Sequence, residues 1–298
     1  MSSPTLSTTV TLVEDEWRDR QRRHVQRVER WIVPRLERRR RGERDPVDDF
    51  LFDYYSWRPA QLARWHPGAD VLMTGDVGEF TSCRGYLVDD TGAHADPHSV
   101  ADMVLSATLR LLEATASRPS SYGCFGRHEW AMVYRQAPDE IRHAAWPLRL
   151  SPSDIADVVE SSPLRCTHFD AFRFYTEAAR PLNLIQPARA TQVDLEQPGC
   201  LHATMDLYKW SFRCYPLVGA DLTADCFALA REIRAVDMRA SPYDLSGLGY
   251  PAITIETAQG RAEYVGYQRD FTLRGAALRQ RLITDLRAAR ACAYPVEG

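Results

Sequence analysis

Residues 201–213, which read LHATMDLYKWSFR, have the spacing of an amphipathic helix. Side chains three or four positions apart share one face of a helix. The apolar face of this segment would carry Leu201, Met205, Tyr208 and Phe212. The opposite face would carry His202, Asp206, Lys209 and Arg213. The segment therefore predicts a helix that packs into a core on one side and presents a row of titratable groups on the other.

Helical patterns also dominate the rest of the chain. Apolar residues recur at three- and four-residue steps over residues 14–41, 96–117, 221–240 and 261–290, and Pro34 is expected to end or kink the first of these helices. Strand patterns are short: residues 71–73 and 84–88 predict a small hairpin, and 252–256 predict one more strand. We expect a mainly α fold with a small β-hairpin, in which a flexible tail of residues 1–13 precedes one helical catalytic domain of residues 14–298.

Composition narrows the class of protein. Of the 298 residues, 45% are hydrophobic and 26% are charged, as in a globular protein. The net charge of −3 gives no overall attraction to nucleic acid, although the Arg-rich run from Arg38 to Arg41 leaves DNA open as a partner. No apolar run approaches the roughly 20 residues that cross a membrane. Seven cysteines without a Cys-x-x-Cys pair predict reduced thiols in a soluble, cytoplasmic protein.

Three polar clusters, at residues 126–130, 166–170 and 200–206, are rich in metal-binding side chains. Two histidines and one carboxylate are the ligands of many non-haem iron enzymes. On a strand, His168 and Asp170 would point to one face. The sequence thus predicts a metal site, with Fe(II) as the expected metal, built from His128, His168 and His202 with Asp170 or Asp206. The alternative is a polar core of hydrogen-bonded histidines and paired carboxylates.

The same clusters suit acid–base chemistry. Burial beside aromatic side chains raises the pKa of one carboxyl group, while a neighbouring carboxylate stays ionised. The expected catalytic groups are Asp170, Glu129, Asp206 and Lys209. The expected substrate contacts are aromatic and arginine side chains that would hold a flat ligand: Tyr54, Tyr55, Arg58, Trp130, Phe172, Arg173 and Tyr208. Core packing is the alternative interpretation of the aromatic residues.

Four segments resemble a group of actinobacterial proteins that carry the label 3-methyladenine DNA glycosylase. They are DFLFDYY at 49–55, RPAQL at 58–62, THFDAFRF at 167–174 and MDLYKW at 205–210, and the resemblance extends over nearly the whole chain after about residue 14. It implies that a flipped base is held between aromatic side chains beside a carboxylate, with Asp170 or Glu129 positioning water. The helix-hairpin-helix and the Cys/His zinc clasp of other glycosylases are missing from this sequence.

Three hypotheses follow from the residues and the resemblance. The first is a hydrolase that cleaves a nucleobase N-glycosidic bond, in DNA or in a free nucleoside. The second is an iron-dependent oxygenase that acts on a small aromatic or amino-acid-like substrate. The third is a binding module without catalysis, in which the polar clusters are core networks. The concentration of titratable groups in short segments favours an enzyme, and the resemblance places the hydrolase first.

Overall fold

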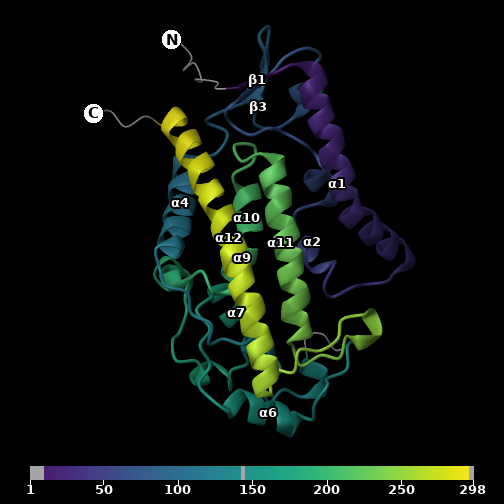
Figure 1. The fold of residues 1–298 in the computed structure, drawn as a ribbon, viewed down its shortest axis with the longest axis vertical. Helices are drawn as coiled ribbons and strands as arrows, with labels where there is room; N and C mark the ends of the chain where they lie inside the picture. Colours follow the sequence, from purple (N-terminus) through teal and green to yellow (C-terminus); the bar gives the residue numbers. More distant parts are fainter. Residues whose placement is uncertain (1–9, 142–144, 295–298) are drawn as a thin grey trace.

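Helix α11, Ala220–Arg239, lies at the centre of the fold in the computed structural model, which describes residues 10–141 and 145–294. Phe227, Ala230 and Ile233 on this helix are completely buried, because its apolar positions cover several faces. The helices α9 (Leu201–Met205), α10 (Leu207–Arg213) and α12 (Ala258–Ala293) pack against it. Figure 1 shows α11 and α12 side by side along the length of the molecule. The predicted mainly α fold is confirmed.

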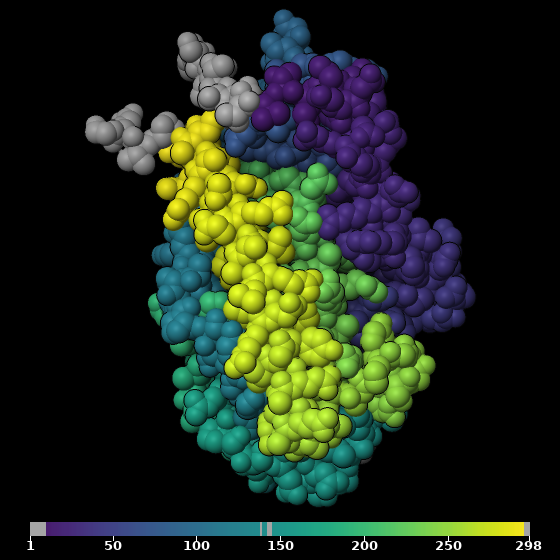
Figure 2. Space-filling model, viewed as in Figure 1, coloured from purple at the N-terminus to yellow at the C-terminus, as the bar shows by residue number. Residues whose placement is uncertain are grey.

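Helix α12 runs along one face of the molecule, with α4 (Asp102–Ala116) beside it (Figure 2). Thr257 caps its first turn, because the Thr257 side chain accepts a hydrogen bond from the backbone N–H of Gly260. Further along the helix, a Cβ atom placed on Gly275 would lie 2.5 Å from Cγ2 of Thr204. The absence of a side chain at Gly275 therefore lets α12 approach α9 closely.

Helix α1, Glu14–Arg41, lies along the opposite edge of the molecule and continues through Pro34 (Figure 1). Of the two outcomes expected at Pro34, an end of the helix or a kink, the helix end does not occur. Proline removes one backbone hydrogen bond from a helix, but side chains on both sides of Pro34 anchor this one. Trp31 and Ile32 are buried before it, and Arg35 and Arg38 bind Asp49 after it.

A small sheet in the strand order β1-β2-β4-β3 covers one end of the helices (Figure 1). Strand β1 (Val10–Leu12) pairs in parallel with β2 (Val71–Met73). Strands β3 (Tyr86–Asp89) and β4 (Gly92–Ala95) form the hairpin, so the predicted pairing of residues 71–73 with 84–88 is wrong. Residues 10–12 also belong to the sheet rather than to a flexible tail, and residues 1–9 of that tail lie outside the described part of the chain.

Short helices fill the space between the long ones. They are α2 (Phe50–Tyr54), α3 (Pro59–Ala63), α5 (Arg127–Ala131), α6 (Pro152–Glu160), α7 (Phe169–Phe172) and α8 (Gln192–Leu195). The strand expected at 252–256 is an irregular segment, in which the Ile253 N–H donates to the carbonyl of Arg239 at the end of α11. Within the described residues, no helix is long and apolar enough to cross a membrane.

Two local patterns near the polar clusters differ in detail from what the sequence suggests. His168 does not lie on a strand, because it is the residue that precedes the short helix α7, so the side chains of His168 and Asp170 are not paired on one strand face. The helix expected over 201–213 is interrupted at Asp206, where α9 ends and α10 begins. Lys209 still contacts Asp206 across the break, with Nζ 3.1 Å from Oδ2.

Candidate functional site

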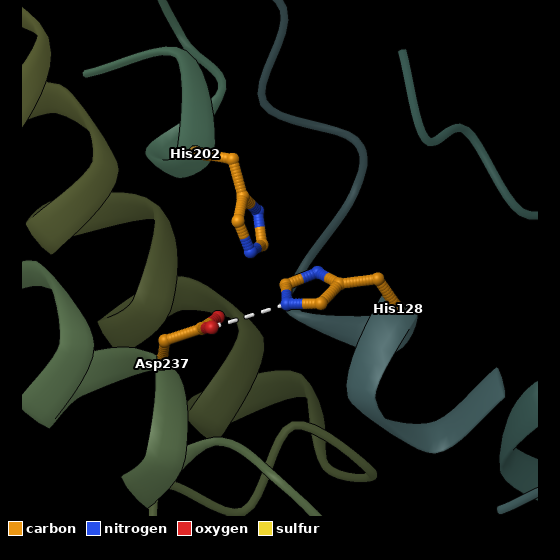
Figure 3. A group of neighbouring side chains, drawn as sticks. All are labelled: His128, His202 and Asp237. Carbon is orange, nitrogen blue, oxygen red and sulfur yellow. Dashed lines mark hydrogen bonds and ion pairs between the residues drawn. The ribbon is translucent and has the colours of Figure 1, made fainter. Parts of the chain in front are cut away.

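Three side chains from three different helices converge in the interior of the molecule. His128 comes from α5, His202 from α9 and Asp237 from α11, and Figure 3 shows the three pointing toward one another. Nε2 of His128 lies 3.1 Å from Oδ2 of Asp237. One ligand atom from each residue lies within 4.8 Å of the other two. His128 and Asp237 are buried, and His202 is half-buried. We call these three residues the triad.

The charges in the triad are set by close contacts. Burial alone would lower the pKa of His128, but the Asp237 carboxylate raises it well above its usual range. Burial alone would raise the pKa of Asp237, and the His128 ring instead holds it below its usual range. Burial and the neighbouring His128 lower the pKa of His202 well below its usual range. The lowered pKa favours His202 as a neutral imidazole, which is the form that binds metals. The raised pKa favours His128 as an imidazolium, so a metal ion would have to displace its proton.

A second polar group lies beside the triad and shares no residue with it. Nδ1 of His168 lies 3.0 Å from Oε1 of Glu196, and Nε2 of His168 lies 3.7 Å from Oδ2 of Asp206. All three side chains are buried. Burial lowers the pKa of His168, but the Glu196 carboxylate outweighs this effect, so the pKa is raised. The His168 ring also stacks on the ring of His202, at 5.3 Å between centroids, and so joins the two groups.

Lys209 neutralises much of the negative charge in this second group. Its Nζ lies 3.0 Å from Oδ2 of Asp170 and 3.1 Å from Oδ2 of Asp206. Arg189 and Arg173 also pair with Asp170, at 3.2 Å and 3.3 Å. Burial raises the pKa of Asp170, but Lys209, His168 and Arg189 together lower it by more, so this carboxylate is ionised at neutral pH. An ammonium group thus lies where a metal ion would have to approach Asp206. In the triad, the guanidinium group of Arg234 lies farther from the carboxylate, at 3.6 Å from Oδ2 of Asp237, so we regard the triad as the better metal-binding group.

A cavity of about 110 Å³ adjoins the triad through His202. Its walls are mainly apolar and aromatic: Phe50, Tyr54, Met132, Ala171, Phe174 and Tyr243. Asp170, Glu129 and Arg234 add polar groups, and Nη1 of Arg234 lies 2.8 Å from Oε1 of Glu129. His202 also lines a smaller cavity together with His128. A small molecule in the aromatic-walled cavity would therefore lie against one member of the triad.

The structure brings many of the predicted site residues together. The rings of His128 and His168 both contact the ring of His202, with centroids 4.5 Å and 5.3 Å apart. Predicted residues that contact the polar groups or line the aromatic-walled cavity are Asp170, Glu129, Asp206, Lys209, Tyr54, Tyr55 and Arg173.

Other predicted contact residues lie elsewhere. Trp130 is buried and donates from Nε1 to the carbonyl of Ala240. Phe172 and Tyr208 are buried in the hydrophobic core. Arg58 is exposed at the start of α3, where its backbone N–H binds the side chain of Gln61. For the three aromatic residues, the core-packing interpretation fits their surroundings better than substrate contact does.

Two carboxylates in these groups were not predicted from the sequence. Asp170 and Asp206 were expected beside the histidines of the metal site, but the carboxylate that completes the triad with His128 and His202 is Asp237. Glu196, which contacts His168, was also missed. A signal for Asp237 did exist: Arg234 and Asp237 lie three positions apart on a helix that is otherwise apolar on that side, and buried charges in such a place need a partner.

The Arg-rich end of α1 forms ion pairs within the protein. Arg38 binds Asp49 at 2.6 Å, and Arg41 binds Glu43 at 2.8 Å. These pairs reduce the positive charge that the run from Arg38 to Arg41 offers to a phosphate backbone. The observation favours a charged surface held by local ion pairs over a DNA-binding helix.

Comparison of the chain with models of known protein families, with curated proteins and with solved structures gave no match. The arrangement of side chains is therefore the basis for assigning a function. That arrangement is a group of two histidines and one carboxylate beside a small aromatic-walled cavity.

Proposed function

We propose that the chain is a metal-dependent enzyme, in which His128, His202 and Asp237 bind Fe(II). The observation that carries the proposal is the convergence of these three buried or half-buried side chains. Two ligands that each lie about 2.1 Å from a metal ion, at right angles to each other, are about 3 Å apart. Nε2 of His128 and Oδ2 of Asp237 share a hydrogen bond at 3.1 Å, and the same separation would suit two adjacent ligands of one metal ion.

The surroundings of the triad position its ligands. Nη1 of Arg234 lies 2.8 Å from Oε1 of Glu129 and 3.6 Å from Oδ2 of Asp237, so the two carboxylates share one guanidinium group. The hydroxyl of Tyr264 donates to Oδ1 of Asp237 at 3.4 Å. Such outer contacts orient metal ligands and tune their basicity.

The donor set favours an oxygenase among metal-dependent enzymes. Fe(II) held by two histidines and one carboxylate keeps coordination positions open for substrate and oxidant. The aromatic-walled cavity next to His202 would hold the substrate. At about 110 Å³ it is smaller than the roughly 300–1,000 Å³ of a drug-sized pocket. We infer a substrate of about one planar ring, with Tyr54 and Phe174 against its faces.

Metal analysis of the purified protein tests the metal site. The protein, reconstituted with Fe(II) without oxygen and then desalted, is expected to retain one iron per chain. His128→Ala, His202→Ala and Asp237→Ala are each expected to abolish this retention. His98→Ala is the control, because His98 is exposed and belongs to neither polar group. Equal iron content in all five proteins would refute the triad as the metal site.

Nitric oxide, a stable analogue of dioxygen, tests for open coordination positions. Addition of nitric oxide to the iron-loaded protein is expected to give the electron paramagnetic resonance signal of a high-spin iron–nitrosyl complex. A protein that retains iron but gives no such signal has a closed site, and the oxygenase proposal would then be wrong. Retention of zinc in preference to Fe(II) would point instead to a metal-dependent hydrolase.

A second candidate is hydrolysis of an N-glycosidic bond, to which the resemblance of the sequence points. The observation in its favour is that two carboxylates, Asp170 and Glu129, line the same aromatic-walled cavity. Asp170 is ionised beside Lys209, so it would stabilise a cationic sugar or orient water. We expect release of base from alkylated DNA or from 7-methylguanosine to persist in chelator and to be lost in Asp170→Asn. Loss of release in chelator would instead favour a metal-dependent reaction.

A further inference from the structure

A larger cavity lies at the end of the molecule that carries the sheet, and it shares no lining residue with the two cavities that His202 lines. Its volume is about 500 Å³, within the roughly 300–1,000 Å³ range of small-molecule sites. It is bordered by the segment before α3, by the start of α4 and by the end of α10. The residues that matter are Trp57, Phe212, Arg64, Arg84, Arg213 and Ser99. We call this space the arginine cavity.

The charge around the arginine cavity has one sign. Arg64, Arg84 and Arg213 all line it, and no acidic side chain lines it among the residues described. None of these three arginines forms one of the ion pairs found in the described part of the chain, unlike Arg38 and Arg41 on α1. All three side chains are exposed, so an anion from solvent can reach them. Arginine presents a planar set of donors that matches the oxygen atoms of a phosphate.

One wall of the cavity is aromatic. The rings of Trp57 and Phe212 lie 4.2 Å apart between centroids, at an angle of 32°, and the ring of Tyr215 lies 6.2 Å from that of Trp57. Nε1 of Trp57 and Oγ of Ser99 are buried polar atoms without a hydrogen-bond partner among the described residues. Both atoms are enclosed by neighbouring groups, so the part of this wall that a ligand can reach is mainly aromatic.

The backbone fixes the position of Arg84 at the rim. Gly85 has a φ of +78°, which glycine adopts without strain. A Cβ atom placed on Gly85 would lie 2.8 Å from Cδ of Pro216 and 3.0 Å from Cβ of Ser99. The loop that carries Arg84 is therefore packed tightly against two other segments next to the cavity.

The N-terminus of α4 adds positive electrostatic potential beside the arginine cavity, which favours an anion. The helix has 15 residues, and its N-cap residue, Ala101, provides no side-chain hydrogen bond to the first turn. The first N–H groups of a helix carry partial positive charge. The nearby carboxylate of Asp102 is held by Nε of Arg290 at 2.6 Å, which offsets its negative charge. The helix terminus thus adds to the attraction that the three arginines provide.

We propose that the arginine cavity binds a planar aromatic ring that carries a phosphate group, as in a nucleoside monophosphate. The ring stacks on the Trp57 and Phe212 wall, and the phosphate is bound by Arg84 and Arg213 with Arg64 beside them. Stacking of a base on an aromatic side chain contributes about 1–3 kcal/mol. The site is separate from the triad, so the inference stands or falls independently of the proposed oxidation chemistry.

Calorimetric titration of the full chain with adenosine monophosphate tests this site. Adenosine and inorganic phosphate are titrated separately, to isolate the ring and the anion. The variants are Arg84→Gln, Arg213→Gln and Trp57→Leu. The matched control is Arg20→Gln, because Arg20 is an exposed arginine on α1 away from the cavity. Far-ultraviolet circular dichroism and the midpoint of urea unfolding are measured on every variant as a check that the fold is unchanged.

One equivalent of adenosine monophosphate is expected to bind. Each of the three cavity variants is expected to weaken binding by about tenfold or more, a change of about 1.4 kcal/mol, and Arg20→Gln is expected to leave it unchanged. Adenosine binding as tight as that of the monophosphate would overturn the role of the arginines. Inorganic phosphate binding as tight would overturn the role of the aromatic wall. No binding at millimolar concentration would overturn the site altogether.

Discussion

The hydroxyl of Tyr55 donates a 2.6 Å hydrogen bond to Oδ1 of Asp206, although 151 positions separate the two residues in the chain. Burial raises the pKa of Tyr55 well above its usual range, and the Asp206 carboxylate raises it further. The raised pKa keeps the Tyr55 hydroxyl protonated, and so a hydrogen-bond donor, at neutral pH. The contact ties the end of α2 to the junction between α9 and α10, where Asp206 also meets Lys209.

Removal of this hydroxyl should destabilise the protein. In Tyr55→Phe, Oδ1 of the buried Asp206 loses its hydrogen bond, and bonds to charged groups contribute about 1.5–3 kcal/mol. Tyr208→Phe is the matched control, since the Tyr208 ring lies 5.7 Å from that of Tyr55. The Tyr208 hydroxyl is buried and has no hydrogen-bond partner among the described residues. Denaturant unfolding should show a loss of about 2 kcal/mol for Tyr55→Phe and less than about 0.5 kcal/mol for Tyr208→Phe. Equal effects would contradict the assignment.

Lys209 should be needed for the fold because it lies between two carboxylates. In Lys209→Met, Asp170 and Asp206 lose their shared cation, and removal of one partner from a buried charge pair costs about 3–5 kcal/mol. Adding Asp206→Asn removes one of the uncompensated charges, so Lys209→Met/Asp206→Asn should be more stable than Lys209→Met alone. Unfolding of the two single variants and the double variant gives the coupling free energy. A coupling near zero would mean that the two groups do not interact in solution.

Contact between α9 and α12 should depend on Gly275. A methyl group at this position would meet Cγ2 of Thr204, whose branched side chain cannot turn away easily, so Gly275→Ala should cost about 1–3 kcal/mol. Thr204→Ala in the same protein should relieve the clash. Gly266→Ala is the control on the same helix, because nothing lies within 4 Å of a methyl group there, and it should stabilise by about 0.5–1 kcal/mol. Thermal unfolding compares the four proteins, and similar shifts at positions 266 and 275 would rule out close packing.

The mainly helical fold could be predicted because its signal is local. The apolar side chains of α11 recur at helical spacing and are buried as expected, including Phe227 and Ile233. Strand pairing was predicted poorly, because the parallel partner of β2 is Val10–Leu12, about 60 positions earlier. No spacing rule links two such short segments. Pro34 was misjudged for a similar reason: the ion pairs of Arg35 and Arg38 with Asp49 are tertiary contacts.

In the candidate site, too, local sequence patterns could be predicted and tertiary contacts could not. His128 and His202 stood out in the sequence because each lies in a dense polar cluster. Asp237 did not, because its neighbours in sequence are the apolar residues of α11 and its partners come from other helices. The arginine cavity gave no sequence signal at all, since Arg64, Arg84 and Arg213 are far apart in the chain. Candidate site residues could be predicted where they lie close together in the sequence. Which of them meet in the folded protein depends on tertiary packing.

The ion pairs of Asp49 should make stability depend on pH in a defined direction. Burial alone would raise the pKa of Asp49, but hydrogen bonds from Arg38 and from the N–H of Asp45, with the charge of Arg35, lower it below its usual value. The ionised form is thus favoured in the folded state. Its contribution to stability is present above the unfolded pKa of about 3.9 and is lost as pH falls through the lower folded value.

Asp49→Asn should therefore be less stable than the natural chain by about 3 kcal/mol at pH 7, because Arg35 and Arg38 lose a buried partner. The difference should shrink as pH falls below about 4, since the natural chain then loses the ionised carboxylate as well. Asp53→Asn is the control: Asp53 also pairs with Arg35, but its side chain is 61% exposed, and exposed pairs contribute about 0–1 kcal/mol. Urea unfolding between pH 3 and pH 7 measures both variants. A difference for Asp49→Asn that stays constant over this range would show that the charge of Asp49 is not what joins α1 to α2.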